Sequence, residues 1–321
     1  MTYSIGGLIE AVDYNGFVST TSGGNINAVW NTSYGQTALG TVSAAGTVTA
    51  TQWATLNNTL TSIGAHQATT LTSRTSPVAG NTIAVLSNLG TDCTSVNTNK
   101  LNAAAQGSQY TACTGTSSKT SATGSGAAAW TITFTHTVTF ANANSATYFF
   151  NAGGTIKIEF SKTSTGTDSD ADWNNLANSI CGDVFISSDG ASKTIAGVSR
   201  TGTSVTGGSG TPGTLLTGTG WNQLTGVPVV IYKQFDTVYT YTNNFIQISA
   251  SKSATVLTLT TVWSDAGDAT PFGSTNNISG GTATSGISFG TAPATVVTYF
   301  PPSAAQLTNT WGTPTVAAAV A

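Results

Sequence analysis

The chain has 321 residues, only 7% of them charged, and a formal net charge of −3. A typical soluble domain carries about a quarter charged residues, so this composition does little to prevent self-association and favours a component of a larger assembly. The nine lysine and arginine residues are scattered singly, which argues against the basic field of a nucleic-acid-binding protein.

The N-terminal sequence MTYSIGGLIEAVDYNG has neither the basic segment nor the apolar core of a secretory signal. Short helical pieces are expected at 8–18 and 26–30, on either side of a Gly-rich break. No apolar run approaches the length of a membrane-spanning helix. We therefore expect no membrane insertion.

Residues 49–64 read TATQWATLNNTLTSIG, and their apolar side chains recur at helical spacing. Thr49 and Gln52 fit a capping box, and Gly64 is a natural C-terminal stop. The Thr and Asn content makes this helix weak alone. It needs a partner to pack against.

A second helical segment is expected at 81–105, where apolar residues alternate by three and four as in a coiled-coil seam. The repeat is short, so a self-associating helix and an ordinary intramolecular helix both stay open. If the helices associate between copies, the expected oligomer interface comprises Trp53, Leu56, Leu60, Leu86, Leu89, Cys93 and Val96.

Residues 114–126 read TGTSSKTSATGSG, with no large apolar side chain, and predict a linker. They divide the chain into a helical attachment or oligomerisation region at 1–113 and a second domain at 127–321.

After this linker the period changes to two, beginning with the alternation from Trp130 to Phe140. Further strands are expected at 155–160, 182–187, 227–233, 237–242, 245–251, 254–263 and 295–300. A helix interrupts them at DADWNNLANSI, and long loops are expected at 197–220 and 267–290. The fold class is therefore mainly β, an antiparallel sandwich of jelly-roll type preceded by the small helical region.

The search for catalytic groups finds no recognisable constellation. His136 lies on the same face of its strand as Trp130, Ile132 and Phe134, as a core or interface histidine would. His66 follows a capped helix, where it is expected to bond the last carbonyls. Neither has a neighbouring triad motif. Asp168, Asp170 and Asp172 resemble the start of a calcium loop, but the later ligands are missing, and acidic residues at a helix N-terminus explain them. We expect no catalytic, cofactor or metal site, and no enzyme.

Cys93, Cys113 and Cys181 lack metal-ligand spacing and are interpreted as small buried hydrophobes, with a Cys93–Cys113 bridge left open. Aromatic residues near the loops have two interpretations: they stack on sugars or anchor a protein contact, or they fill the core. These residues are Trp221, Phe272, Tyr299 and Trp311.

Several motifs occur in a fixed order: GGLIEAVDYN, INAVW, YGQT, TVTATQWATL, HQATT and YFFNAGGTIKIEF. In these the chain resembles virion proteins of tailed bacteriophages, of the kind found in cyanophages and marine phages. The resemblance is clearest from Gly6 to Phe160 and carries no catalytic residue with it.

The resemblance implies a structural protein of the virion, placed on the tail. The favoured hypothesis is a homotrimeric tail fibre or baseplate-attached appendage that contacts other tail proteins, with a host surface glycan as a further expected partner. A capsid decoration or neck protein, and a separate glycan-binding module, are the alternatives. In YFFNAGGTIKIEF, we expect Ile156, Ile158 and Phe160 to face the core and Lys157 and Glu159 to keep the other face soluble.

Overall fold

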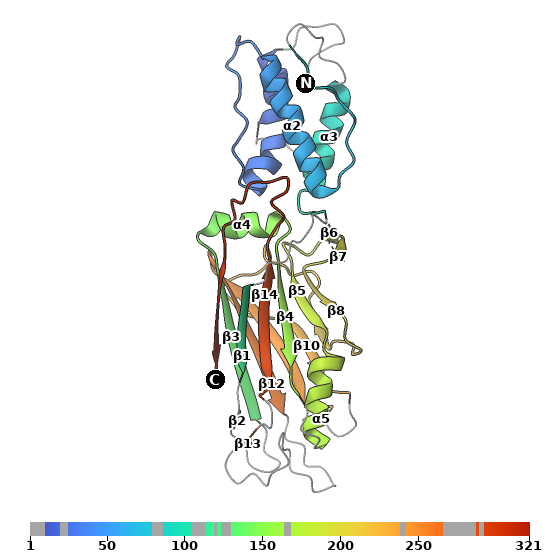
Figure 1. Cartoon of the computed structure of the whole chain (residues 1–321), viewed down its shortest axis with the longest axis vertical. Coiled ribbons are helices and arrows are strands. Elements are labelled where there is room, and N and C mark those ends of the chain that lie inside the picture. The colour runs from blue at the N-terminus through green and yellow to red at the C-terminus, as the bar shows by residue number, and fades with distance from the viewer. Residues whose placement is uncertain are drawn as a thin grey trace.

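The computed structural model describes residues 10–19, 25–78, 86–104, 113–118, 121–122, 130–163, 168–237, 242–265, 287–288 and 292–321. The molecule is elongated, with the first helices gathered at one end and the sheets at the other (Figure 1). We call the described residues of 10–104 the helical head and those of 113–321 the sheet body. A single hydrophobic core nevertheless includes residues of both parts, from Tyr14 to Trp311.

The helical head contains three α-helices and one π-helical segment, namely α1 (Ala11–Val18), η1 (Ala28–Ser33), α2 (Ala50–Gln67) and α3 (Leu86–Thr98). The predicted capping box of α2 is present: the Gln52 N–H donates to Thr49 Oγ1 at 3.2 Å, and the Thr49 N–H donates to Gln52 Oε1 at 2.8 Å. The two orphan amides at this end of α2 are therefore satisfied.

The predicted end of this helix at Gly64 is wrong. Helix α2 continues to Gln67 and ends at Ala68, whose φ is 54°. A Cβ atom on Gly64 would lie 2.5 Å from Leu71 Cδ1. The glycine therefore serves the close packing of the returning chain and does not stop the helix.

The residues expected at an oligomer interface form the core of the head instead. The exposed fraction is 2% or less for each of Trp53, Leu56, Leu60, Leu89, Cys93 and Val96; the side chain of Leu86 lies outside the described residues. Trp53 meets the rings of Tyr14 and Phe17 edge-on, with centroids 5.5 and 6.0 Å apart. Because one copy already covers these side chains, they offer no surface to a second.

The sheet body holds two large antiparallel sheets, in the orders β1-β14-β4-β5-β8 and β15-β3-β12-β11-β10-β9. Two small pairs, β2 with β13 and β6 with β7, complete the described strands. The strands are β1 (Cys113–Ser118), β2 (Ser121–Ala122), β3 (Trp130–Thr139), β4 (Thr155–Ser161), β5 (Asp183–Ile186), β6 (Lys193–Ile195), β7 (Val198–Arg200), β8 (Thr203–Thr206), β9 (Thr214–Leu215), β10 (Val229–Phe235), β11 (Phe245–Lys252), β12 (Val256–Asp265), β13 (Ile287–Ser288), β14 (Ala294–Phe300) and β15 (Thr315–Val320). The helical segments of the body are α4 (Ala143–Asn151), α5 (Asp168–Asn175) and η2 (Leu176–Ile180).

Side chains from the two large sheets meet in the core. Phe160 of β4 stacks on Tyr232 of β10 with centroids 6.1 Å apart, and Trp263 Nε1 of β12 donates to Thr295 Oγ1 of β14 at 3.3 Å. The expectation of a mainly antiparallel β architecture with a few helices is confirmed. The predicted strand at 237–242 lies largely outside the described residues.

The predicted linker at 114–126 contains strands. β1 pairs with β14 along its whole length, from Cys113 opposite Tyr299 to Ser118 opposite Ala294, and β2 pairs with β13. Residues 119–120 and 123–129 lie outside the described part of the chain. Backbone ladders need no large apolar side chain, so composition alone misread an edge strand as a linker.

The aromatics of the YFFNAGG stretch lie on a helix rather than directly before a strand. Asn142 Oδ1 accepts from the Ser145 N–H at 2.9 Å and caps α4. Phe149 and Phe150 on this helix are both fully buried. The chain then turns at Gly153, whose φ is +97°, into β4.

Residues 301–314, which we call the C-terminal strap, leave β14, reach the head and return as β15 (Figure 1). The Gln36 side chain of the head pairs with the strap twice: its Nε2 donates to the Thr308 carbonyl oxygen at 2.8 Å, and its Oε1 accepts from the Thr308 N–H at 2.9 Å. Leu307 and Trp311 of the strap are buried. The strap therefore ties the head to the body.

Candidate functional site

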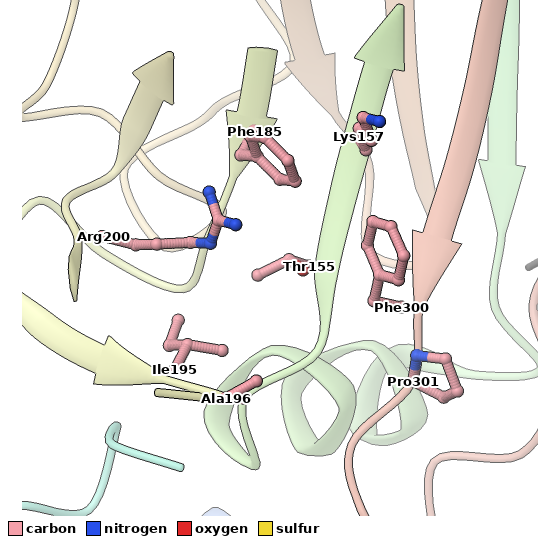
Figure 2. A pocket seen from close by; sticks show the side chains of 9 residues that line it. Thr155, Lys157, Phe185, Ile195, Ala196, Arg200, Phe300 and Pro301 are labelled. Carbon is pink, nitrogen blue, oxygen red and sulfur yellow. The ribbon is translucent and has the colours of Figure 1, made fainter. Parts of the chain in front are cut away.

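A cavity of about 170 Å³ lies against the outer face of the five-stranded sheet, at the end of β4 where that strand begins (Figure 2). Strands β4, β5 and β14 form one side, and the β6–β7 hairpin forms the other. The lining residues are Gly153, Thr155, Lys157, Phe185, Ile195, Ala196, Arg200, Phe300 and Pro301.

The side chains of β4 alternate between the two faces of the sheet. One set faces the core, as the sequence predicts, and the other faces the cavity. Ile156 and Ile158 are fully buried, so Thr155 and Lys157 face the opposite side of the strand. The sheet register places Phe300 opposite Thr155 and Phe185 opposite Lys157. Three neighbouring strands thus bring two aromatic rings and a lysine together.

The β6–β7 hairpin covers this face. Its two turn residues, Ala196 and Gly197, have φ values of 51° and 78°, and φ is positive at both central positions in type I′ turns. Such a turn matches the twist of the flanking strands, which lets Arg200 pair back to Lys193. This places Arg200 at the cavity.

The head holds the hairpin in place through Ala103, just after α3. The Ala103 N–H donates to the Thr194 carbonyl oxygen and the Ala196 N–H donates to the Ala103 carbonyl oxygen, each at 2.8 Å. A Cβ atom on Gly153 would lie 2.4 Å from the Ala103 Cβ. The cavity therefore lies at the junction of head and body, and its shape depends on their docking.

Phe185 is the centre of the cavity wall. The guanidinium carbon of Arg200 lies 3.6 Å from its ring centroid, and Phe300 stacks near it, with centroids 6.3 Å apart and an interplanar angle of 25°. A cation stacked on an aromatic face is attracted by the ring quadrupole. This contact holds the guanidinium between Phe185 and Thr155 (Figure 2).

Lys157 carries the second positive charge of the cavity. Its Nζ lies 2.6 Å from Glu159 Oε1 and 2.8 Å from Asp183 Oδ2. Burial alone would lower the pKa of Lys157, but the hydrogen bonds to Asp183 and Glu159 outweigh it and raise the pKa. Lys157 and Glu159 thus form an ion cluster beside the cavity, beyond the solubilising role expected of them.

Lys193 and Ser188 form a contact that superficially resembles a serine–lysine catalytic pair, with the lysine Nζ donating to Ser188 Oγ at 2.6 Å. Burial lowers the pKa of Lys193, opposed by its ion pair with Asp189. Both side chains are buried and the ammonium is paired. The contact anchors the hairpin and does not face solvent-borne substrate.

A second cavity, of about 390 Å³, runs along α2 in the head. Its lining is mostly polar, and its one charged lining residue among those described, Arg74, pairs with Asp92. The described residues of its lining include no aromatic ring and no second cation, so it is the weaker candidate site.

The structure separates most of the residues singled out in the sequence. His136 is buried in the core as expected. The expected role of His66 is wrong: it lies within α2 and donates from Nε2 to the Ala152 carbonyl oxygen at 3.1 Å. Cys93 and Cys181 are free and buried, which excludes the Cys93–Cys113 bridge.

The aromatic and acidic candidates are likewise assigned to the core or left undescribed. Trp221, Tyr299 and Trp311 are at most 5% exposed, so the core interpretation is correct for them; Phe272 and the side chains of Asp168 and Asp170 lie outside the described residues. Within the described ranges, no group of three or more His, Cys, Asp or Glu residues could hold a metal ion.

Sequence reasoning missed Phe185, Arg200, Ile195 and Phe300 as neighbours. Arg200 lies on a strand of three residues inside the segment 197–220, interpreted as loop, and Ile195 lies on a strand of three residues just before that segment. Such strands are too short for a period to be read from them. The signal that was available is Lys157 itself, a cation on a strand of a chain with few charges.

None of the helices in the described part of the chain is long and apolar enough to cross a membrane. Comparisons with protein-family models, with curated proteins and with solved structures find no match to this chain.

Proposed function

We propose that the chain is a non-enzymatic structural subunit of a tailed-bacteriophage virion, a homotrimeric tail fibre or baseplate-attached appendage. The ordered motifs of the N-terminal half support the virion assignment, and an elongated shape with a distinct head at one end suits a subunit that attaches at that end (Figure 1). A capsid decoration or neck protein is the alternative within the same class.

The observation that carries the assembly role is the outer face of the six-stranded sheet. On β3, β12 and β11 the residues that alternate with the buried core residues are uncharged at neutral pH, and most carry hydroxyl groups. They are Thr131, Thr133, Thr135, Thr137, Thr139, Val256, Thr258, Thr260, Val262, Ser264, Phe245, Gln247, Ser249 and Ser251. We call them the threonine face.

A second copy of the chain is the occupant that we propose for the threonine face. Charged residues are depleted at the cores of protein interfaces because burying an unpaired charge is costly. The β3 and β12 residues of two threonine faces bring no like charges together. Lys233 of β10, whose Nζ lies 3.6 Å from the Phe245 ring centroid, borders the face at β11. Since the apolar residues of the head are already buried within one chain, this face replaces them as the proposed interface.

We also infer that the body is a variant of the jelly roll. In each large sheet an early strand of the body pairs with a late one, β1 with β14 and β3 with β12. A jelly roll has this pattern because one long antiparallel pair of strands is folded over into two layers. The departure is that β4, β5 and β8 stay in one sheet. Jelly rolls occur in viral capsid and lectin domains, a fold-level analogy that supports the proposal without setting the function.

The proposed interface is tested by light scattering on the purified protein, for which we expect a mass three times the 32.3 kDa of one chain. Thr135→Lys, at the centre of β3, should lower that mass, because three buried ammonium groups would face one another. The matched control is Thr55→Lys on the exposed side of α2, which should stay trimeric. A wild-type monomer at micromolar concentration would refute the assembly role.

The virion assignment needs a separate measurement. Mass spectrometry of purified phage particles should detect the chain as a stoichiometric component, and a density map of the particles should locate it on the tail. Detection on the capsid or neck would select the alternative. Its absence from particles in cells that produce the chain would contradict the assignment.

A further inference from the structure

The charged side chains that line the cavity of Figure 2 are all basic. Among the residues that line it, the charged ones are Lys157 and Arg200, both basic, in a chain with nine basic residues and a net charge of −3. Glu159 and Asp183 pair with Lys157 but do not line the cavity. Since Lys157 is already paired with these two carboxylates, Arg200 is the lining cation that an anionic group would meet.

Arg200 is held in a geometry suited to a carboxylate. Its contact with Phe185, 3.6 Å from the guanidinium carbon to the ring centroid, engages the face of the guanidinium. The N–H donors of a guanidinium lie in its plane, around the edge, and match the two oxygens of a carboxylate. Because the aromatic contact already restricts the arginine, binding loses less side-chain entropy.

The remaining walls limit the size and character of the ligand. A cavity of about 170 Å³ is close to the ~150 Å³ that accommodates a single benzene ring. Phe300, Ile195 and Pro301 supply apolar surface, and Thr155 supplies a hydroxyl. A single six-membered ring with one acidic substituent fits these walls.

We propose that this cavity binds a ring-sized carboxylic acid, with the carboxylate on Arg200 and the ring against Phe300 and Ile195. Two sources share this chemistry, an acidic sugar of a glycan and a free cyclic acid. The proposal does not depend on the proposed function, because a monomeric protein outside any virion would still hold the cavity.

The test is a ligand-detected NMR titration of the whole chain with glucuronate and with cyclohexanecarboxylate. Each should bind with a dissociation constant on the order of 1 mM, as suits one small ring with one ion pair. Tighter binding of glucuronate assigns the site to acidic sugars, and tighter binding of cyclohexanecarboxylate assigns it to free cyclic acids. Glucose, which lacks the carboxylate, should bind at least about tenfold more weakly.

Substitutions test whether the acids bind at Arg200. Arg200→Gln should weaken both acids at least about tenfold, whereas Lys233→Gln should leave them unchanged. Lys233 is a matched control because its ammonium also lies 3.6 Å from an aromatic centroid, that of Phe245, on the other large sheet. Circular dichroism establishes that each variant is folded. If Arg200→Gln does not fold, Arg200→Lys is tested in its place. We expect this variant to bind the acids at least about threefold more weakly, because lysine keeps the positive charge but lacks the planar guanidinium.

Three results would overturn the proposal. The first is no binding of either acid at about ten times the expected dissociation constant. The second is equal binding by wild type and the folded arginine variant. The third is binding of inorganic sulfate as tight as that of the acids, which would indicate an anion site with no selection for the ring.

Discussion

His66 has its imidazole fully buried between head and body. Because Nε2 donates to the Ala152 carbonyl oxygen, Nδ1 carries the lone pair, and Nδ1 finds no hydrogen-bond partner among the described residues. The ring of Tyr34 packs edge-on against it, with centroids 5.2 Å apart. Burial lowers the pKa of His66 to about 4, against the opposing effect of the bond to Ala152.

This burial predicts a loss of stability in acid. Unfolded histidine has a pKa near 6.5, so between about pH 6.5 and pH 4 the unfolded chain binds a proton that the folded chain excludes. The free energy of unfolding should therefore fall as pH falls through this window, by about 3 kcal/mol once pH is below 4. Above pH 6.5 the effect vanishes.

Urea unfolding at pH 7 and at pH 4, on wild type and on His66→Gln, isolates this contribution. Glutamine keeps a donor for Ala152 and cannot titrate, and His136 is present in both proteins. The drop in free energy between the two pH values should be smaller in the variant by about 2–3 kcal/mol. An equal drop in both would contradict the assignment.

At the scale of single elements, the turn of the β6–β7 hairpin contains a local mismatch. Ala196 has a φ of 51°, a left-handed conformation that costs a non-glycine residue about 1–2 kcal/mol. Asparagine tolerates this conformation, and Asn-Gly is the preferred sequence of a type I′ turn.

We expect Ala196→Asn to stabilise the protein by about 0.5–1 kcal/mol, measured as a rise in the midpoint of thermal unfolding. Ala191→Asn is the control, because Ala191 is exposed in the same region and has no positive φ. A gain in the control as large as that at Ala196 would mean that relief of backbone strain is not the cause.

Long elements were predictable from the sequence and short ones were not. The alternation of β3 runs over ten residues, and the capping box of α2 fixes a helix start, so local pattern suffices for both. β1 has no large apolar side chain in its sequence and is specified by its partner β14. α4 has a capping asparagine, but its two adjacent phenylalanines suit a strand equally well.

The candidate site failed to appear in the sequence for the same reason. Lys157 and Phe185 are opposite each other only because β4 pairs with β5, and Arg200 reaches them only through the hairpin turn. These contacts join residues about 30 to 150 positions apart in the sequence. No periodic pattern within a short segment can therefore predict them. The buried interface residues were misjudged because spacing identifies an apolar face without identifying what covers it.

At the scale of the whole molecule, the C-terminal strap and the shared core lead us to expect that head and body unfold together. Gln36 is 4% exposed and satisfies both backbone groups of Thr308. Gln36→Ala would remove both hydrogen bonds, and because Thr308 is itself exposed, the expected cost is about 0.5–1.5 kcal/mol for each bond.

We expect the Gln36→Ala protein to unfold at lower urea concentration, with helix and sheet signals still changing together. Gln223→Ala is the control: Gln223 is exposed and its bond to Gly220, three residues away, is local, so its effect should stay within about 0.5 kcal/mol. Equal midpoints for the two variants would show that the strap adds nothing to the stability of the junction.

The route of the strap also determines how the molecule responds to a broken backbone. The chain passes between head and body once after Ala104 and twice more through residues 301–314, outward and back. A protease that cuts one of these three crossings produces two fragments without a covalent link, which stay together through the shared core and the Gln36–Thr308 hydrogen bonds. Nicked protein should therefore migrate as a single species on a native gel and separate into pieces only in detergent.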